Sequence, residues 1–350
     1  MPATLRSVSR RLLPLALAPL CLSVFIGMPT QADTSMRSAS PARADRHSPR
    51  ILHRENLRPV HYSNSGALTP VSLQQPDRDP SLPGQTEPAT EPDIEPLTGK
   101  AVLQSEVAYV QDLASSTVLY DKNSDEVRPI ASISKLMTAL VVAEARQPMD
   151  AVLRISDADV DRLRHSRSRL SVGTELSRAD MLHLALMSSE NRAAHALARY
   201  YPGGMPAFVR AMNDKARALG MRNTRFVEPT GLSSENVSSP RDLVHLLQAV
   251  SKQPLIHRYT TDDTYRVTVG KGRELVYNNT NRLVRNGNWD IKVSKTGFIN
   301  EAGECLVMLT RIGDRDLAIV LLNSSGRYSR IGDAVRLRNL VENSNVIAML

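Results

Sequence analysis

The sequence contains very little cysteine: only Cys21 and Cys305 occur among its 350 residues. Cys21 lies inside an apolar N-terminal run that we expect to be cleaved from the chain, which leaves one cysteine in the mature protein. An exported protein with a single cysteine has no internal disulfide. Its folded part must therefore be stabilised by an apolar core.

Aromatic residues are also scarce, at 4% of the chain, and this limits what the basic residues can bind. The formal net charge is +8, and three of the positive charges belong to arginines in the N-terminal run. The densest basic stretch, RLRHSRSR at 162–169, has no aromatic neighbours on which bases would stack. We therefore exclude nucleic acid as a partner and interpret the stretch as a solvated loop or a loop facing an anionic polymer.

The first 32 residues have the pattern of a secretory signal peptide. Three arginines precede an apolar run over 12–28, and Thr30 and Ala32 have the small-residue spacing of a cleavage site. Cys21 follows Leu20 instead of a small residue, so lipidation is not expected. An uncleaved membrane anchor is the alternative, because the apolar run approaches the length of a span. We predict a signal peptide at 1–32 and no stable membrane anchor.

Residues 33–98 differ in composition from the rest of the chain. They hold ten of its 21 prolines, interspersed with serine and charged residues, and have little apolar periodicity. Such a stretch buries too little apolar surface to offset the entropy of ordering it. We predict a Pro-rich disordered tether over 33–98, with no chemistry of its own.

From residue 99 the pattern is that of a globular domain. EVAYVQDL and TVLYDKN alternate like two strands of a hairpin, helical spacing follows in several stretches, and three strand-like runs come after residue 290. A final helix is predicted from about 328 to 342. Because strands lie at both ends with helices between them, we predict one α+β domain over 99–345, with an antiparallel sheet built from both termini and an intervening helical region.

Lysine is the third scarce residue, with eight lysines against 36 arginines. One of them, Lys135, lies three positions after Ser132 in ASISKLMTA, near the start of a predicted helix. That spacing places both side chains on one helix face, and the positive end of a helix favours the neutral form of the amine. A neutral amine beside a hydroxyl is a general base beside a nucleophile. A capping serine and a surface lysine are the alternative.

Two further motifs follow in order. SEN at 189–191 lies at a predicted break between two helices, and KTG at 295–297 lies within a predicted strand. Ser-x-Asn occurs again at 234–236, which we interpret as loop. The ordered set Ser-x-x-Lys, Ser-x-Asn and Lys-Thr-Gly is characteristic of serine β-lactamases and penicillin-binding proteins, in which aspartate usually stands between the serine and the asparagine.

The chain resembles the low-molecular-weight penicillin-binding proteins of the D-alanyl-D-alanine peptidase family, and most closely their soluble endopeptidase branch. The resemblance extends over about 100–345 and excludes the tether. It rests on the stretches ASISKLMTA, LALMSSENRAAHALA, YYPGG, LGMRNTRFVEPTGLSSENVS and SKTGFINEAGECLVM. It implies a penicillin-binding protein or serine β-lactamase-like fold.

The resemblance also implies three catalytic residues. Ser132 would attack the carbonyl of a D-alanyl peptide bond, Lys135 would accept its proton, and Ser189 would relay that proton to the leaving amine. Asn191 would hold Lys135 and the substrate amide. Water would then hydrolyse the acyl-enzyme.

Four consecutive residues of the third motif are expected to bind substrate. Lys295 would keep the site positive, Thr296 would bind an anionic group, and Gly297 would let substrate approach the strand backbone closely. The backbone N–H groups of Ser132 and Phe298 would form the oxyanion hole.

Neighbouring residues of similar chemistry are given structural roles. Ser134 points away from Lys135 on the helix, and Ser188 has the wrong spacing to the asparagine of its motif. His165, His183 and His195 lie near the motifs, but a lysine mechanism needs no histidine. No zinc-ligand spacing and no phosphate-binding glycine loop is present, so we predict no metal and no cofactor.

Two departures from the wider family narrow the expected activity. Class A β-lactamases carry a glutamate that activates the deacylating water, and EPTGLSSEN at 228–236 does not fit its pattern, so fast penicillin hydrolysis is not expected. Only 53 residues follow Gly297, which leaves no room for the β-rich domain and anchor helix of the membrane-bound carboxypeptidases.

The resemblance therefore implies a periplasmic serine DD-endopeptidase. Its partners would be the cross-linked peptides of peptidoglycan, with D-alanyl-diaminopimelyl bonds cleaved, and β-lactam antibiotics as covalent inhibitors. Two alternatives stay open: a DD-carboxypeptidase or slow β-lactamase on the same scaffold, and a β-lactam- or peptidoglycan-binding module without turnover.

Overall fold

The computed structural model describes residues 102–348. The predicted signal peptide (1–32), the tether (33–98) and the start of the domain at residue 99 lie outside these residues and stay predictions. None of the helices within 102–348 is both long enough and apolar enough to cross a bilayer.

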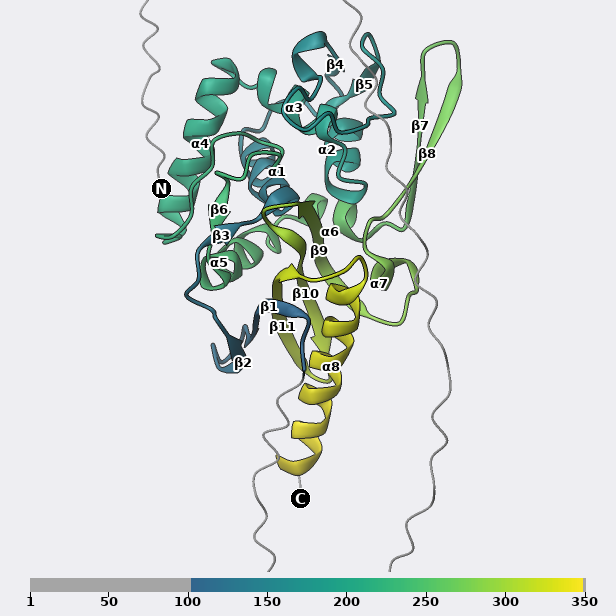
Figure 1. Cartoon of the computed structure of the whole chain (residues 1–350). Coiled ribbons are helices and arrows are strands. Elements are labelled where there is room, and N and C mark those ends of the chain that lie inside the picture. The colour runs from purple at the N-terminus through teal and green to yellow at the C-terminus, as the bar shows by residue number, and fades with distance from the viewer. Residues whose placement is uncertain (1–101, 349–350) are drawn as a thin grey trace, which may run out of the picture. The chain divides into compact units, whose positions relative to one another are not determined.

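A five-stranded antiparallel sheet takes its strands from both ends of the described domain (Figure 1). The strands are β1 (Ser105–Asp112), β2 (Val118–Lys122), β9 (Asp290–Ile299), β10 (Gly303–Ile312) and β11 (Arg315–Ser324). Their order in the sheet is β2-β1-β11-β10-β9. The pairing of β1 with β11 joins the two ends of the domain, with Tyr109 opposite Val320. This confirms the predicted α+β fold with a sheet built from both termini.

The long apolar runs of the C-terminal strands are explained by a sheet that is covered on both faces. Val307 and Leu309 of β10 belong to the large core shared with the helices. Leu306 and Met308 of the same strand belong to a second cluster, which includes Leu337 of α8 (Ser329–Ala348). Because successive side chains of a strand point to opposite faces, a strand covered on both sides must be apolar at every position.

Seven further helices accompany the sheet in the described residues. They are α1 (Ser134–Glu144), α2 (Arg178–Met187), α3 (Asn191–Arg199), α4 (Gly204–Ala218), α5 (Pro240–Val250), α6 (Pro254–Thr261) and the short α7 (Arg282–Arg285). Helices α5 and α6 pack on one face of the sheet, and α8 covers the other. Helix α1 is central, since nine of its eleven residues are buried.

The predicted break between α2 and α3 is present and has a local cause. Ser177 caps the start of α2 in a capping box with Asp180. At the other end, Ser189 has a φ of 62°, in the left-handed region, so the helix cannot continue through it. Such a conformation costs a serine about 1–3 kcal/mol and is commonly held at functional sites.

Several small elements were not predicted from the sequence. They are helices α6 and α7, β3 (Arg128–Pro129) paired with β6 (Val237–Ser238), β4 (Val152–Arg154) paired with β5 (Glu175–Ser177), the β7–β8 hairpin (Thr264–Val269 and Arg273–Asn278), and the 3-10 turns η1 (Ala131–Ile133) and η2 (Asp157–Asp159). The hairpin extends beside α2 in Figure 1. The alternating residues on either side of GKG are typical of a β-hairpin, so this element could have been predicted. The two-residue strands carry none, since each depends on a partner far along the chain.

Candidate active site

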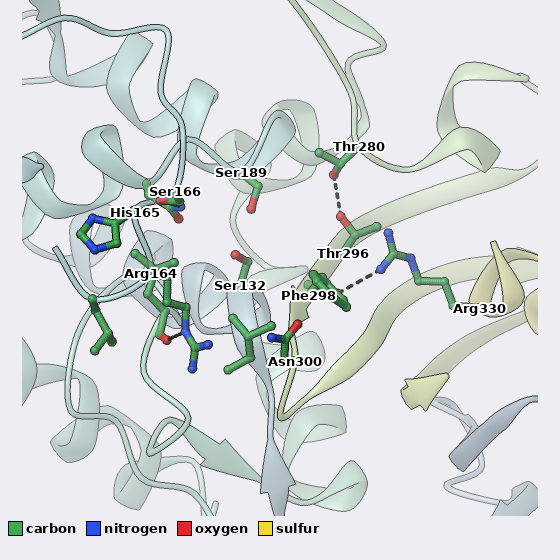
Figure 2. Close-up of a pocket in the computed structure, with 15 residues that line it drawn as sticks. Ser132, Arg164, His165, Ser166, Ser189, Thr280, Thr296, Phe298, Asn300 and Arg330 are labelled. Atoms are coloured by element: carbon green, nitrogen blue, oxygen red, sulfur yellow. Dashed lines mark hydrogen bonds between the residues drawn. The ribbon is translucent and has the colours of Figure 1, made fainter. Parts of the chain in front are cut away.

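A cleft of about 730 Å³ lies where the helical region meets the edge strand β9 (Figure 2). Six of the eight predicted site residues line it: Ser132, Ser189, Asn191, Thr296, Gly297 and Phe298. The other two, Lys135 and Lys295, are each 1% exposed, and their amines bond to lining residues. The three sequence motifs therefore meet at one place in the fold.

The Lys135 amine is held by three oxygens from three parts of the chain. Its Nζ lies 3.0 Å from Ser132 Oγ, 2.7 Å from Asn191 Oδ1 and 2.6 Å from the Thr230 carbonyl. Ser132 lies in the 3-10 turn that leads into α1, and Lys135 lies in the first turn of the helix, so the three-residue spacing brings the side chains together. Asn191 begins α3, directly after the helix break.

Burial lowers the pKa of Lys135 to about 8, although the charges of Glu228 and Glu190 oppose the shift. The main cause of the lowered pKa is therefore desolvation, and not the helix N-terminus as expected from the sequence. With a pKa of about 8, roughly a tenth of the amine is neutral at pH 7. The lysine is thus able to act as a base near neutral pH.

Ser189 and Lys295 form a second hydroxyl–amine pair in the cleft. Lys295 Nζ donates to Ser189 Oγ at 3.0 Å and to the Thr296 carbonyl at 2.8 Å. Burial, followed by the charges of Lys135 and Arg330, holds the pKa of Lys295 well below its usual value. The predicted role of Lys295 in keeping the site positive stays a prediction. A guanidinium also lies nearby.

Arg330 on α8 supplies that guanidinium, and sequence analysis missed it. It lines the cleft, donates to the Gly297 carbonyl at 3.0 Å and forms an ion pair with Glu304. Burial lowers its pKa to about 10, which leaves it charged at neutral pH. No motif surrounds Arg330 in the sequence, so only its position in the fold identifies it.

The strand β9 forms one wall of the cleft. Thr296 Oγ1 lies 2.7 Å from Thr280 Oγ1, a residue that also lines the cleft. A Cβ atom at Gly297 would lie 3.0 Å from the Ser132 nitrogen, so a larger residue would fit here only if β9 or η1 moved by a few tenths of an ångström. Phe298 is 56% exposed. The use of its backbone N–H and that of Ser132 as oxyanion donors stays a prediction.

The opposite wall includes part of the basic stretch 162–169, which was predicted to be a solvated loop or to face an anionic polymer. Residues 163–166 line the cleft. Asn191 Nδ2 donates to Ser166 Oγ at 3.0 Å, and Arg164 pairs with Glu301 at 2.8 Å and donates to the Leu232 carbonyl. The stretch is therefore a structural part of the site.

The neighbouring serines are engaged elsewhere. Ser134 Oγ donates to the Ala131 carbonyl and Ser188 Oγ donates to the Leu184 carbonyl, each at 2.8 Å. His183 is buried and stacks on Tyr259, and His195 contacts Asp159 at 2.8 Å. His165, in contrast, lines the cleft.

Within residues 102–348, no three His, Cys, Asp or Glu side chains are grouped closely enough to hold a metal ion. Cys305 is fully buried, and burial raises the pKa of its thiol to about 11. It is therefore an inert core residue and not a nucleophile.

Comparison with known sequences agrees with this geometry. A family model described as D-alanyl-D-alanine carboxypeptidase matches residues 95–326. The D-alanyl-D-alanine endopeptidase of Pseudomonas aeruginosa is 50% identical over 248 residues, which cover 71% of this chain and 80% of that protein. The D-alanyl-D-alanine endopeptidase of Escherichia coli is 49% identical over 241 residues, covering 69% and 78%.

Solved structures lead to the same conclusion. The Streptomyces K15 DD-transpeptidase matches with a TM-score of 0.64 at 28% identity, over 68% of this chain and 97% of that chain. Penicillin-binding protein D2 from Listeria monocytogenes, in its ampicillin-bound form, matches with a TM-score of 0.58 at 30% identity, over the same shares. The chain belongs to the D-alanyl-D-alanine carboxypeptidase family and is a serine DD-peptidase.

Proposed function

We propose that this protein is a periplasmic DD-endopeptidase that cleaves D-alanyl-diaminopimelyl cross-links in peptidoglycan through an acyl-enzyme, and that β-lactams acylate the same serine. The observation that carries the chemistry is the 3.0 Å contact between Ser132 Oγ and a buried lysine amine. The choice of an endopeptidase is supported by relatives with that name at 50% and 49% identity.

The partners of Lys135 accommodate both forms of its amine: in the protonated form, Ser132 Oγ and the two other oxygens accept its three hydrogens. A neutral amine has two hydrogens and one lone pair. The Asn191 Oδ1 and Thr230 carbonyl oxygens accept the two hydrogens, which leaves the lone pair facing the Ser132 hydroxyl. Lys135 then takes the hydroxyl proton while Ser132 Oγ forms a bond to the D-alanyl carbonyl carbon.

The tetrahedral intermediate requires donors for its oxyanion and a proton for the leaving amine. The backbone N–H groups of Ser132 and Phe298 are assigned to the oxyanion, where each such donor contributes about 3 kcal/mol. Ser189 is assigned to pass the proton on, and its hydroxyl is held at 3.0 Å by Lys295. The C–N bond then breaks, and water hydrolyses the ester on Ser132.

Substrate would lie along β9 with an anionic group toward Thr296 and Arg330. Both residues line the same end of the cleft in Figure 2. The charge of Arg330 suits a carboxylate of the peptide. The tether would let the catalytic domain reach bonds within the wall layer.

A DD-carboxypeptidase is the second candidate, favoured by the description of the matching family model. Both activities attack the same carbonyl and differ in the leaving group. Incubating the mature protein with purified cross-linked muropeptide dimers and separating the products by chromatography distinguishes them. We expect monomers to appear and Ser132→Ala to yield none. Persistence of the dimers would contradict the endopeptidase proposal.

A further inference from the structure

The turn at 228–233 is in direct backbone contact with the nucleophile's own turn. Gly231 has a φ of 80°, and a Cβ atom there would lie 1.8 Å from the Ala131 carbonyl oxygen and 2.8 Å from the Ser132 nitrogen. Such contact leaves no room for independent movement, because interiors are packed without gaps. Whatever fixes this turn therefore also fixes the surroundings of Ser132.

The Glu228 carboxylate holds the 228–233 turn in place by accepting hydrogen bonds from its residues and from Asn236. One oxygen accepts from Thr230 N at 2.6 Å and Thr230 Oγ1 at 2.5 Å. The other accepts from Gly231 N at 2.6 Å, Asn236 Nδ2 at 3.0 Å and Ser233 N at 3.4 Å. The two carboxylate oxygens together thus accept from four N–H groups and one hydroxyl.

Two connections run from this turn to the first turns of α1. The Thr230 carbonyl accepts from Lys135 Nζ at 2.6 Å. Asn236 is fully buried, and its Nδ2 also donates to Ser134 Oγ at 3.0 Å. Asn236 belongs to the second Ser-x-Asn, which was interpreted as loop from the sequence. It ties Glu228 to α1 beside the catalytic pair.

Three ionisable groups face the Lys135 amine from three elements. Glu228 approaches from the 228–233 turn and Glu190 from the break before α3, and both charges favour the protonated amine. Lys295 on β9 repels it, as the lowered pKa of Lys295 reflects. Glu190 is bound by Ser168 and does not touch the lysine directly. Of the two carboxylates, only Glu228 also shapes the carbonyl that Lys135 contacts.

We propose that Glu228 is a positioning residue for this reaction: through the Thr230 carbonyl it fixes the Lys135 amine against Ser132, and its negative charge acts on the same amine. The proposal rests on the assignment of Lys135 as the general base. Glu228 has no role as a base for the deacylating water, because both of its oxygens are occupied by donors from its own turn and from Asn236.

The test is the pH dependence of acylation by labelled penicillin in the mature protein with Glu228→Gln. The amide presents hydrogens to some of the five donors, so the turn shifts and acylation slows about 10- to 100-fold, as for a misplacement of about 1 Å. Acylation requires neutral Lys135, so in the parent protein the acylation rate decreases as the pH falls below about 8. This decrease is the acid limb of the pH profile. Loss of the negative charge lowers the pKa of the amine, so this acid limb moves to lower pH.

Glu228→Asp separates charge from geometry. The shorter side chain keeps the charge but reaches fewer donors, so acylation slows while the acid limb stays in place. Glu235→Gln is the matched control: Glu235 lies in the same segment, is 63% exposed and pairs only with Arg225 among the described contacts. Glu235→Gln is expected to leave both the acylation rate and the position of the acid limb unchanged.

An unmoved acid limb in Glu228→Gln, or a rate equal to that of the parent protein, overturns the proposal. A thermal melt of each variant shows whether it is folded, and the limb is measured on the folded fraction. Failure of the underlying mechanism is recognised separately, because Lys135→Arg would then still be acylated. If Lys135→Arg is inert and Glu228→Gln behaves like the parent protein, only the role of Glu228 is wrong.

Discussion

Lys135 and Lys295 are both buried at the cleft, in a chain that uses arginine for most of its positive charge. An arginine is not deprotonated in a protein, whereas a buried lysine has a lowered pKa. Each amine contacts the hydroxyl of one motif serine at 3.0 Å. The scarcity of lysine thus makes these two positions informative in the amino-acid sequence itself.

Lys135→Arg is expected to abolish acylation by labelled penicillin although the positive charge is kept. The guanidinium cannot accept the proton of Ser132, so the hydroxyl is not activated. Labelling is measured by gel fluorescence against time. Lys122→Arg is a suitable control, since Lys122 Nζ also bonds to backbone carbonyls, those of Leu103 and Ser105, but lies outside the cleft. Normal labelling of Lys135→Arg would rule out the proposed mechanism.

At the scale of elements, the site depends on how closely three backbones approach one another. The turn η1 is enclosed by β9 on one side and by the 228–233 turn on the other. Glycines stand at both contacts, Gly297 on β9 and Gly231 in the turn. Their lack of a Cβ atom allows Ser132 to lie between a strand and a turn.

Gly297→Ala is therefore expected to slow acylation about 100-fold, because β9 and η1 must separate. The added Cβ atom would lie 3.0 Å from Ala131 Cβ and from the Ser132 nitrogen. Stability should fall by about 1–3 kcal/mol, the usual cost of overpacking. Gly270→Ala, in the β7–β8 turn, has nothing within 4 Å of its added Cβ atom and should change neither quantity. A fully active Gly297→Ala would contradict this account of the contact.

The elements predicted from the sequence are those whose apolar pattern is local. Helix α2, helix α3 and the long strands each bury a face or a whole segment, so their periodicity was visible. The position of 163–166 at the cleft could not be predicted, because the partners of Arg164, Leu232 and Glu301, lie far along the chain. Glu228 was missed for the same reason. The groups that donate to it are nearby in sequence, but Lys135, which contacts the Thr230 carbonyl in the same turn, lies much earlier, in α1.

At the scale of the whole molecule, the residues assigned to the site come from both sides of the junction between helices and sheet. Ser132, Lys135, Ser189 and Asn191 are on the helical side, while Lys295, Thr296 and Gly297 are on the edge strand. An edge strand has unpaired backbone groups along its outer side. A peptide substrate is therefore expected to extend the sheet at β9.

Export follows from the predicted signal peptide. The mature chain should begin near Asp33 and be recovered in the periplasmic fraction, with its N-terminus identified by mass spectrometry. Replacing the arginines of the signal with glutamates should retain the precursor in the cytoplasm. Recovery of the full-length chain in washed membranes would instead indicate an uncleaved anchor.

The central claim is that Ser132 attacks cross-links in preference to terminal D-alanine. The most direct measurement is a competition, with cross-linked dimers and monomeric pentapeptide present together and both products followed by chromatography in one timed digest. The account predicts that dimers become monomers while the pentapeptide is left largely intact, and that Ser132→Ala leaves both unchanged. Conversion of pentapeptide to tetrapeptide while the dimers persist would contradict it.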